Sequence, residues 1–259
     1  QKTSFLAWNP ASVAAVVCSL GLLIAIVVAT FVDIHQKAER EKEFQALTLR
    51  VTDQLRIRMR GYAYGLRGTR SAILTLGSDR VSRRQFHEYL ASRNIHHEFP
   101  GVMGYGFVRR VPAAAAPEFL RKARADGAPQ FAIRELAPNP GERWIIQYLE
   151  PEAANAAVIG FDLASERNRR NTILQAIQTG EATVTPPITL VQARSKPAQG
   201  FLVLLPVYAT SDTPATVPLR QRHAVGLTYA PFLIDQVMSS LDFHNDAFSM
   251  IIRARNGDG

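Results

Sequence analysis

The sequence predicts an α+β protein with an N-terminal transmembrane helix, a long stalk helix and a following domain of antiparallel sheets. Residues 11–32 contain no charged side chain, and a helical spacing of apolar residues continues from residue 33 to about residue 80 without a proline. Beyond residue 80, short apolar segments typical of strands alternate with short helices. This mixture is typical of antiparallel sheets in an α+β fold.

The uncharged segment at 11–32 has the length of a membrane-crossing helix, which needs roughly 20 apolar residues. A signal peptide has a shorter apolar core followed by a small-x-small cleavage site, whereas this segment runs directly into Asp33 and Lys37. We therefore expect an uncleaved transmembrane helix, preceded by a flank at 1–10. Positive charges are more numerous after the segment than before it, where Lys2 stands alone, and this count places the following domain in the cytoplasm.

A continuous stalk helix is expected at 33–80, because apolar residues recur every three or four positions while the opposite face is charged. The stripe consists of Phe44, Leu47, Val51, Leu55, Met59, Tyr62, Leu66, Ile73 and Leu76. Such a stripe needs a partner, which is either a second copy of the helix or a domain lying along it. We interpret its first half as a stalk and the seam of a parallel homodimer. The alternative is the first helix of an ordinary domain.

The remaining elements of the domain at 81–259 follow from capping residues, turn residues and alternation. Helices are expected at 82–95 with Ser82 as N-cap, at 113–126, at 165–178 between Ser165 and Gly180, and at 231–241. Strands are expected at 100–112, 131–136, 144–149, 158–163, 183–192, 201–208, 224–229 and 247–253.

The composition excludes several classes of function. Hydrophobic residues make up 47% and charged residues 20% of the 259 residues, which is ordinary for a globular chain. The net charge is +8, but the arginines are interleaved with acidic residues, so we expect no nucleic-acid partner. A single cysteine, Cys18, allows neither an intrachain disulfide nor a cysteine zinc site, and the histidines form no HExxH motif. No metal or other cofactor is expected.

Three blocks of sequence carry a resemblance to a known family. They are FPGVMGYGFVRRVP at 99–112, IGFDLASERNRRNTILQAIQTGEATVTPPITLVQ at 159–192 and GFLVLLPVY at 200–208. Together they resemble the CHASE family of extracytoplasmic sensory domains, found in receptor histidine kinases and nucleotide cyclases, over roughly residues 44–241. The block around Asp162 is the most specific of the three.

The resemblance implies an architecture and a location. The stalk helix would carry two PAS-like subdomains, with a ligand pocket in the membrane-distal one at about 100–210. The domain would lie in the periplasm, between the helix at 11–32 in the inner membrane and a second membrane helix beyond residue 259, followed by an output domain. This expectation is opposite to the charge count, and we follow the resemblance.

Candidate ligand-binding residues come from the resemblance and from the residue types themselves. Plant members of the family bind cytokinins, which are adenine derivatives, and Asp162 matches the aspartate that accepts hydrogen bonds from the adenine. Leu190 matches a position whose backbone meets the ligand. Asp162 has a structural alternative, as the cap of the following helix or the partner of a nearby arginine. Thr185 lies in a proline-containing turn that can shape a pocket mouth or simply be a turn.

Further candidates are aromatic residues on strands, each of which could stack on a planar ligand or pack in the core. They are Tyr105, Phe107, Tyr148, Phe201 and Tyr208. The arginine-rich run at 167–170 could hold an anion at the start of the expected helix, or could be a solvated helix face.

These observations favour an extracytoplasmic sensor domain that binds a small molecule and signals through its stalk. The small molecule could be an adenine derivative. The receptor is expected to be a bacterial histidine kinase; a membrane diguanylate cyclase and a membrane-anchored dimerisation scaffold without a ligand are the alternatives. No nucleophile motif, phosphate loop or metal-site spacing is present, so this part of the protein is not expected to be an enzyme.

Overall fold

The structure is a computed structural model that describes residues 10–190 and 198–239. The chain divides into two compact units, Gln1–Gln54 and Leu55–Gly259. The described part of the first unit is helical throughout and belongs to helix α1 (Pro10–Leu76). Its apolar side chains between residues 13 and 34 are exposed, and by length and composition this helix can cross a membrane. The expected helices at 11–32 and 33–80 are therefore one continuous helix.

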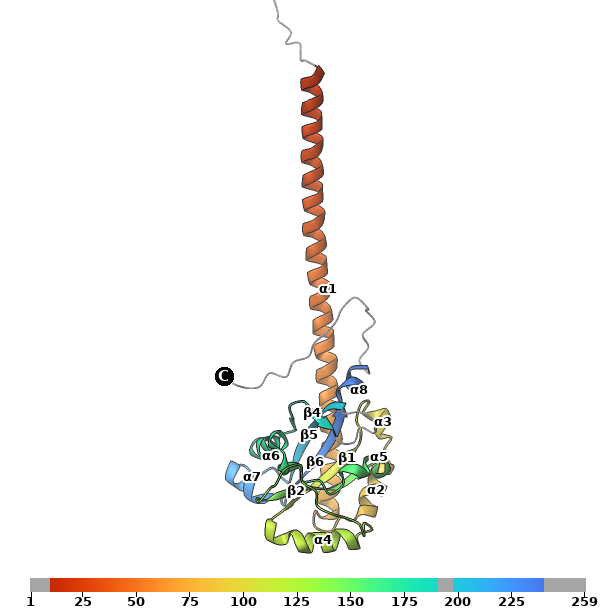
Figure 1. Cartoon of the computed structure of the whole chain (residues 1–259), viewed down its shortest axis with the longest axis vertical. Helices are drawn as coiled ribbons and strands as arrows, with labels where there is room; N and C mark the ends of the chain where they lie inside the picture. The colour runs from red at the N-terminus through yellow and green to blue at the C-terminus, as the bar shows by residue number, and fades with distance from the viewer. Residues whose placement is uncertain (1–9, 191–197, 240–259) are drawn as a thin grey trace, which may run out of the picture. The chain divides into compact units, whose positions relative to one another are not determined.

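The second unit contains one antiparallel sheet, with helices on both of its faces (Figure 1). Its strands are β1 (Tyr105–Val111), β2 (Arg143–Glu150), β3 (Thr183–Val184), β4 (Ile188–Leu190), β5 (Ala198–Tyr208) and β6 (Ala224–Leu233). The order across the sheet is β2-β1-β6-β5-β3, and β4 also pairs with β5. Since the described residues form a single sheet, two separate PAS-like subdomains are not shown.

The second unit also contains short helices before, between and after these strands. They are α2 (Arg83–Ala91), α3 (Ile95–Glu98), α4 (Ala116–Ala125), α5 (Glu152–Asn155), α6 (Arg167–Thr179), α7 (Val217–His223) and α8 (Ile234–Ser239), with 3-10 turns at Ala113–Ala115, Ala156–Val158 and Leu163–Ser165. Ser82 caps α2 as expected, and Gly180 ends α6 in a left-handed conformation.

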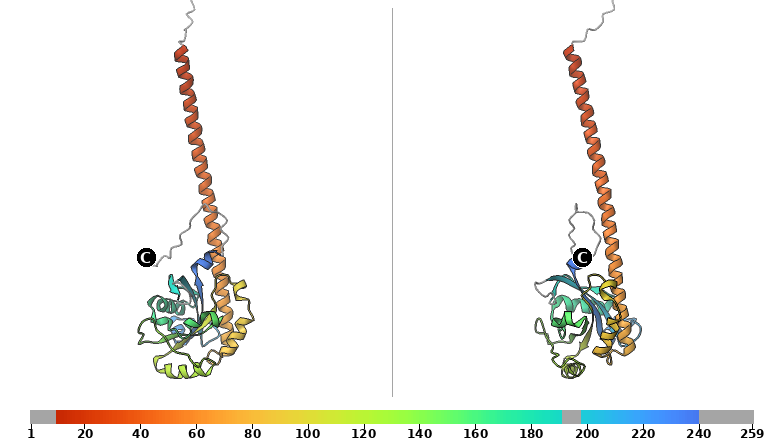
Figure 2. Two further views of the ribbon diagram at one scale, coloured as in Figure 1. Left: turned by 45° about the vertical axis from the view of Figure 1, so that its right-hand side comes forward. Right: turned by 90° about the vertical axis from the view of Figure 1, so that its right-hand side faces the viewer.

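The strands present apolar side chains to both faces of the sheet, because neighbouring side chains of a strand point to opposite sides. In β5, Val203 and Leu205 face one side, and Leu202 and Leu204 face the other. The first side packs against residues 55–76 of α1 together with α2 and forms the α1-side core. The second packs against α6 and forms the α6-side core. Figure 2 shows α1 and α6 on opposite faces of the sheet.

Several expected elements are corrected. The segments 131–136 and 158–163 are not strands but form isolated bridges. Gly160 adopts φ +88°, which turns the chain away from an extended conformation. A Cβ at this position would lie 2.1 Å from the Ala132 carbonyl oxygen, so only glycine fits there. The chain at Pro231 continues β6 instead of beginning a helix, since its carbonyl accepts a hydrogen bond from Met103. The expected strand at 247–253 lies outside the described residues, and α7 was not expected.

Candidate functional site

A small cavity lies between the sheet and α6, with about 30 Å³ accessible to water. The segment before α6, α6 itself and strands β2, β4, β5 and β6 all contribute to its wall. Its apolar lining consists of Leu136, Ile146, Val158, Phe161, Leu163, Leu190 and Leu202. Three polar side chains complete the wall: Asp162, Arg169 and Tyr229. An apolar cavity with a few convergent polar groups has the character of a small-molecule site.

Asp162 is fully buried, and its carboxylate is held by three N–H groups. Oδ1 accepts from the backbone of Trp144 at 2.8 Å and of Ala164 at 3.0 Å, and Oδ2 accepts from the Asn139 side chain at 2.7 Å. The bond to Ala164 caps the 3-10 turn Leu163–Ser165, whereas the helix that follows, α6, is capped by Glu166, so Asp162 has a capping role but not at the helix where it was expected. Among the described residues no arginine pairs with this carboxylate. Oδ2 keeps a free acceptor position, because a carboxylate oxygen can accept two hydrogen bonds.

The helix cap lies one residue later than expected. Glu166, and not Ser165, is the N-cap of α6, and its carboxylate accepts from Asn168 at 2.8 Å and from Arg169 at 3.0 Å. Ser165 instead donates its hydroxyl to the Asp162 carbonyl at 2.6 Å and accepts from the Leu136 backbone at 2.9 Å. Ser165 thus holds the segment that carries Asp162 in place.

Arg169 is the buried member of the run at 167–170; Arg167 and Arg170 are exposed. Its side chain is 8% exposed, and its Nη1 lies 3.8 Å from a Glu166 carboxylate oxygen. Within the described ranges the guanidinium donates a single hydrogen bond, from Nη2 to the Thr189 carbonyl at 3.1 Å. Burial lowers the pKa of this guanidinium, while Glu166 opposes that shift.

Tyr229 contributes a hydroxyl with no hydrogen-bond partner among the described residues, although its side chain is completely buried. Burial raises the pKa of this phenol. A buried hydroxyl without a partner costs stability, so its presence in a cavity wall needs an explanation. The sequence placed Tyr229 at the end of a strand but gave no sign of which side chains it would face.

The other sequence candidates divide between the two faces of the sheet. Leu190 lines the cavity together with Asp162. Thr185 is buried beside β5, where its hydroxyl oxygen accepts from the Leu202 backbone at 3.0 Å. Tyr208 packs in the α6-side core and donates to the Ile177 carbonyl at 3.0 Å.

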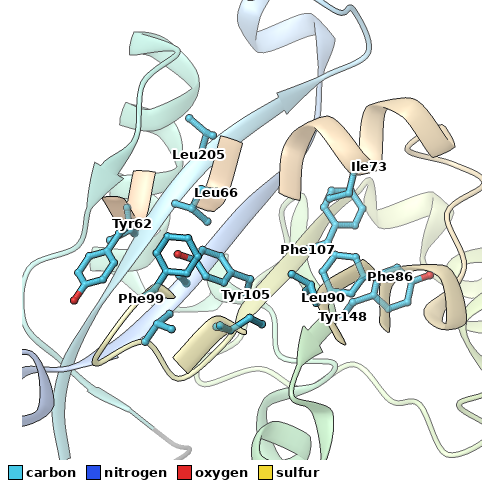
Figure 3. Packing of buried hydrophobic residues seen from close by; sticks show 14 of the residues in the cluster. Tyr62, Leu66, Ile73, Phe86, Leu90, Phe99, Tyr105, Phe107, Tyr148 and Leu205 are labelled. Carbon is cyan, nitrogen blue, oxygen red and sulfur yellow. The ribbon is translucent and has the colours of Figure 1, made fainter. Parts of the chain in front are cut away.

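The remaining aromatic candidates lie on the opposite face, away from the cavity wall. Tyr105, Phe107 and Tyr148 are buried in the α1-side core, where Figure 3 shows them with Tyr62 and Ile73 of α1. Phe201 is partly buried and stacks on Phe232 with ring centroids 5.2 Å apart. For these residues the structure supplies core contacts and no route to the Asp162 cavity.

Larger clefts of about 470 and 560 Å³ lie near α2 and α4, and one of about 410 Å³ lies along residues 127–134. Several of their polar groups are paired within the protein: Arg109 donates to Asp79 at 2.9 Å, and the His87 Nδ1 lies 3.1 Å from Glu150. In the part of the chain that the structure describes, no cluster of three or more His, Cys, Asp and Glu could hold a metal ion. The cavity beside Asp162 is distinguished from these clefts by its unpartnered polar group.

A comparison with models of protein families gives a match. The family model described as CHASE domain matches residues 79–257, which is more than half of the 259 residues. The matched range begins just after α1 ends and includes the whole sheet and the cavity wall. A search of curated proteins gives no match.

Proposed function

The chain belongs to the CHASE domain family of extracytoplasmic sensors, and on that basis we propose that a small molecule binds in the cavity beside Asp162 and changes the output of a receptor through α1. The single observation that carries this proposal is the cavity wall itself. A fully buried carboxylate with one free acceptor position and a buried hydroxyl without a partner face the same space. The Tyr105 hydroxyl in the α1-side core also has no partner among the described residues, so it is the combination of a free hydroxyl with a buried carboxylate in one cavity wall that supports the proposal.

Strand β6 provides a physical connection from the cavity to α1. Tyr229 lines the cavity, while its neighbours Thr228 and Ala230 lie on the other side of the sheet. The Thr228 hydroxyl lies 3.3 Å from the carbonyl of Leu66 in α1 and 3.5 Å from that of Leu205. A ligand that displaces Tyr229 therefore acts on the strand that contacts α1.

We propose that the sensor lies in the periplasm, anchored in the inner membrane by the first part of α1, and that the output domain is a bacterial histidine kinase. A diguanylate cyclase is the alternative output. We further propose that the receptor is a homodimer whose seam uses Phe44, Leu47, Val51 and Leu55. Met59, the next residue of the stripe, packs against the α1-side core, and Val51 is only 7% exposed in the single chain, so Phe44, Leu47 and Leu55 are the positions most available to a second copy.

The proposal is tested by screening a metabolite library for compounds that raise the melting temperature of the full chain in lipid nanodiscs. Compounds that stabilise the protein are then titrated against Asp162→Asn and against Glu118→Gln, a control on the exposed face of α4. The proposal predicts a compound whose affinity falls with the first substitution only. A library without any stabilising compound, or compounds that bind both variants equally, would favour the ligand-free scaffold.

A further inference from the structure

We infer that the cavity beside Asp162 recognises a small hydroxycarboxylate, whose carboxylate is held by Arg169 and Tyr229 and whose hydroxyl donates to Asp162. The inference rests on the proposed function of this cavity as the ligand site. It names the chemical class of the ligand, for which the family resemblance suggested only an adenine derivative.

The cavity wall contains two charged side chains, Asp162 and Arg169. The Asp162 carboxylate already accepts three hydrogen bonds. The Arg169 guanidinium has five N–H groups and, within the described ranges, donates one hydrogen bond. Its acidic neighbour Glu166 lies 3.8 Å away and already accepts from two backbone N–H groups of α6. The charged group of the cavity wall with N–H donors left for a ligand is therefore the Arg169 guanidinium.

A carboxylate is the anion that best fits the Arg169 guanidinium. A guanidinium presents its donors in a planar fork that matches a carboxylate with two parallel hydrogen bonds. The Tyr229 hydroxyl, which has no partner among the described residues, supplies one more donor in the same cavity wall. A phosphate dianion would place a second negative charge in an apolar cavity that contains one arginine, which is costly.

The Asp162 carboxylate would repel a bound carboxylate that carried no hydrogen-bond donor. Its Oδ2 accepts one hydrogen bond and has room for one more. A single hydroxyl beside the carboxylate satisfies this position, whereas an ammonium would bring three N–H groups into a wall that is otherwise apolar. The small size of the cavity, with about 30 Å³ accessible to water, favours the smallest members of the class over a purine.

The experiment compares three probes of nearly equal size on the full chain in nanodiscs, by calorimetric titration at constant ionic strength. Glycolate has both groups, acetate lacks the hydroxyl and glycolamide lacks the charge. We expect glycolate to bind tightest, and the loss of either group to weaken binding by roughly 10- to 100-fold. Arg169→Gln should abolish the preference for glycolate over glycolamide, and Asp162→Asn should reduce the preference for glycolate over acetate.

Matched variants separate recognition from folding. Arg167→Gln removes the same charge from the exposed side of the same helical turn and should bind glycolate as the wild type does. Tyr229→Phe removes only the unpartnered hydroxyl, so the ligand-free protein should be at least as stable while glycolate affinity falls. Arg169→Lys keeps the charge without the planar fork and serves where Arg169→Gln does not fold.

The inference is overturned if glycolate fails to bind the wild type, if glycolamide binds as tightly, or if Arg169→Gln and Tyr229→Phe bind glycolate unchanged. Its failure can be told from failure of the proposed function. A different compound from the library screen that depends on Asp162 would leave the sensor assignment standing and reject only the hydroxycarboxylate. Absence of every Asp162-dependent compound would reject both.

Discussion

Substituting Asp162 by asparagine should destabilise the domain even without a ligand. The new side chain keeps one carbonyl oxygen, which can still accept from Trp144 and Ala164. In the wild type, the amide nitrogen of Asn139 donates to Asp162 Oδ2 at 2.7 Å. In the variant, this nitrogen faces the amide nitrogen of the new asparagine, which cannot accept. The variant loses one charge-assisted hydrogen bond in a fully buried place, at a cost of about 1.5–3 kcal/mol.

The expected fall in melting temperature follows from the size of the domain. For about 150–250 residues, each kcal/mol lowers the melting temperature by about 2–4 °C, so the variant should melt about 3–12 °C lower. Circular dichroism of the full chain in nanodiscs measures this, and Glu118→Gln on the exposed face of α4 should leave the melting temperature unchanged. The double variant Asp162→Asn with Asn139→Asp exchanges donor and acceptor and should recover part of the loss. An unchanged melting temperature in the single variant would refute the reasoning.

Four further predictions concern other parts of the chain. Gly65→Ala should destabilise the domain by about 1–3 kcal/mol in thermal unfolding, since the new Cβ would lie 2.3 Å from the Tyr105 hydroxyl. Gly61→Ala, which meets nothing within 4 Å, should instead stabilise by about 0.5–1 kcal/mol; equal effects would contradict the packing. Burial raises the pKa of Tyr105 and Tyr148 above the unfolded value of about 10, so the stability that their neutral forms contribute is intact below pH 10 and lost above it; ultraviolet titration should show them ionising only as the domain unfolds. Single cysteines that replace Phe44, Leu47 or Val51 should form crosslinks between two chains. Cysteines at the positions between them, on the opposite face of the helix, should form no such crosslinks. An alkaline phosphatase fusion after residue 259 should be active, and cytoplasmic-only activity of a matched reporter would support the charge count instead.

The parts of the fold that the sequence predicts are those with local signals. The apolar run, the proline-free helix, the Ser82 cap and the Gly180 stop can each be recognised from neighbouring residues alone, and the structure contains all four. The segment at 158–163 was mistaken for a strand because its apolar residues hide the left-handed turn at Gly160.

The cavity was only half predictable, because its wall joins residues that are distant in sequence. Asp162 and Leu190 belong to one recognisable block, whereas Tyr229 reaches them only through the pairing of β6 with β1 and β5. The strand alternation around Tyr105 and Phe107 showed that they share a face but not which helix covers it. Arg169 was one of three arginines in four residues, and only the position of α6 distinguishes the buried one.

The central claim is that a small molecule binds on the α6 side of the sheet, and fluorine NMR of the full chain labelled with 3-fluorotyrosine tests it most directly. The Tyr229 resonance is assigned by its loss in Tyr229→Phe, and the protein in nanodiscs is titrated separately with glycolate and with adenine. The account predicts that glycolate shifts the Tyr229 resonance and leaves those of Tyr105 and Tyr148, on the α1 side, in place. A Tyr229 resonance that is moved neither by these two compounds nor by any stabilising compound from the library screen, or shifts confined to Tyr105 and Tyr148, would contradict it.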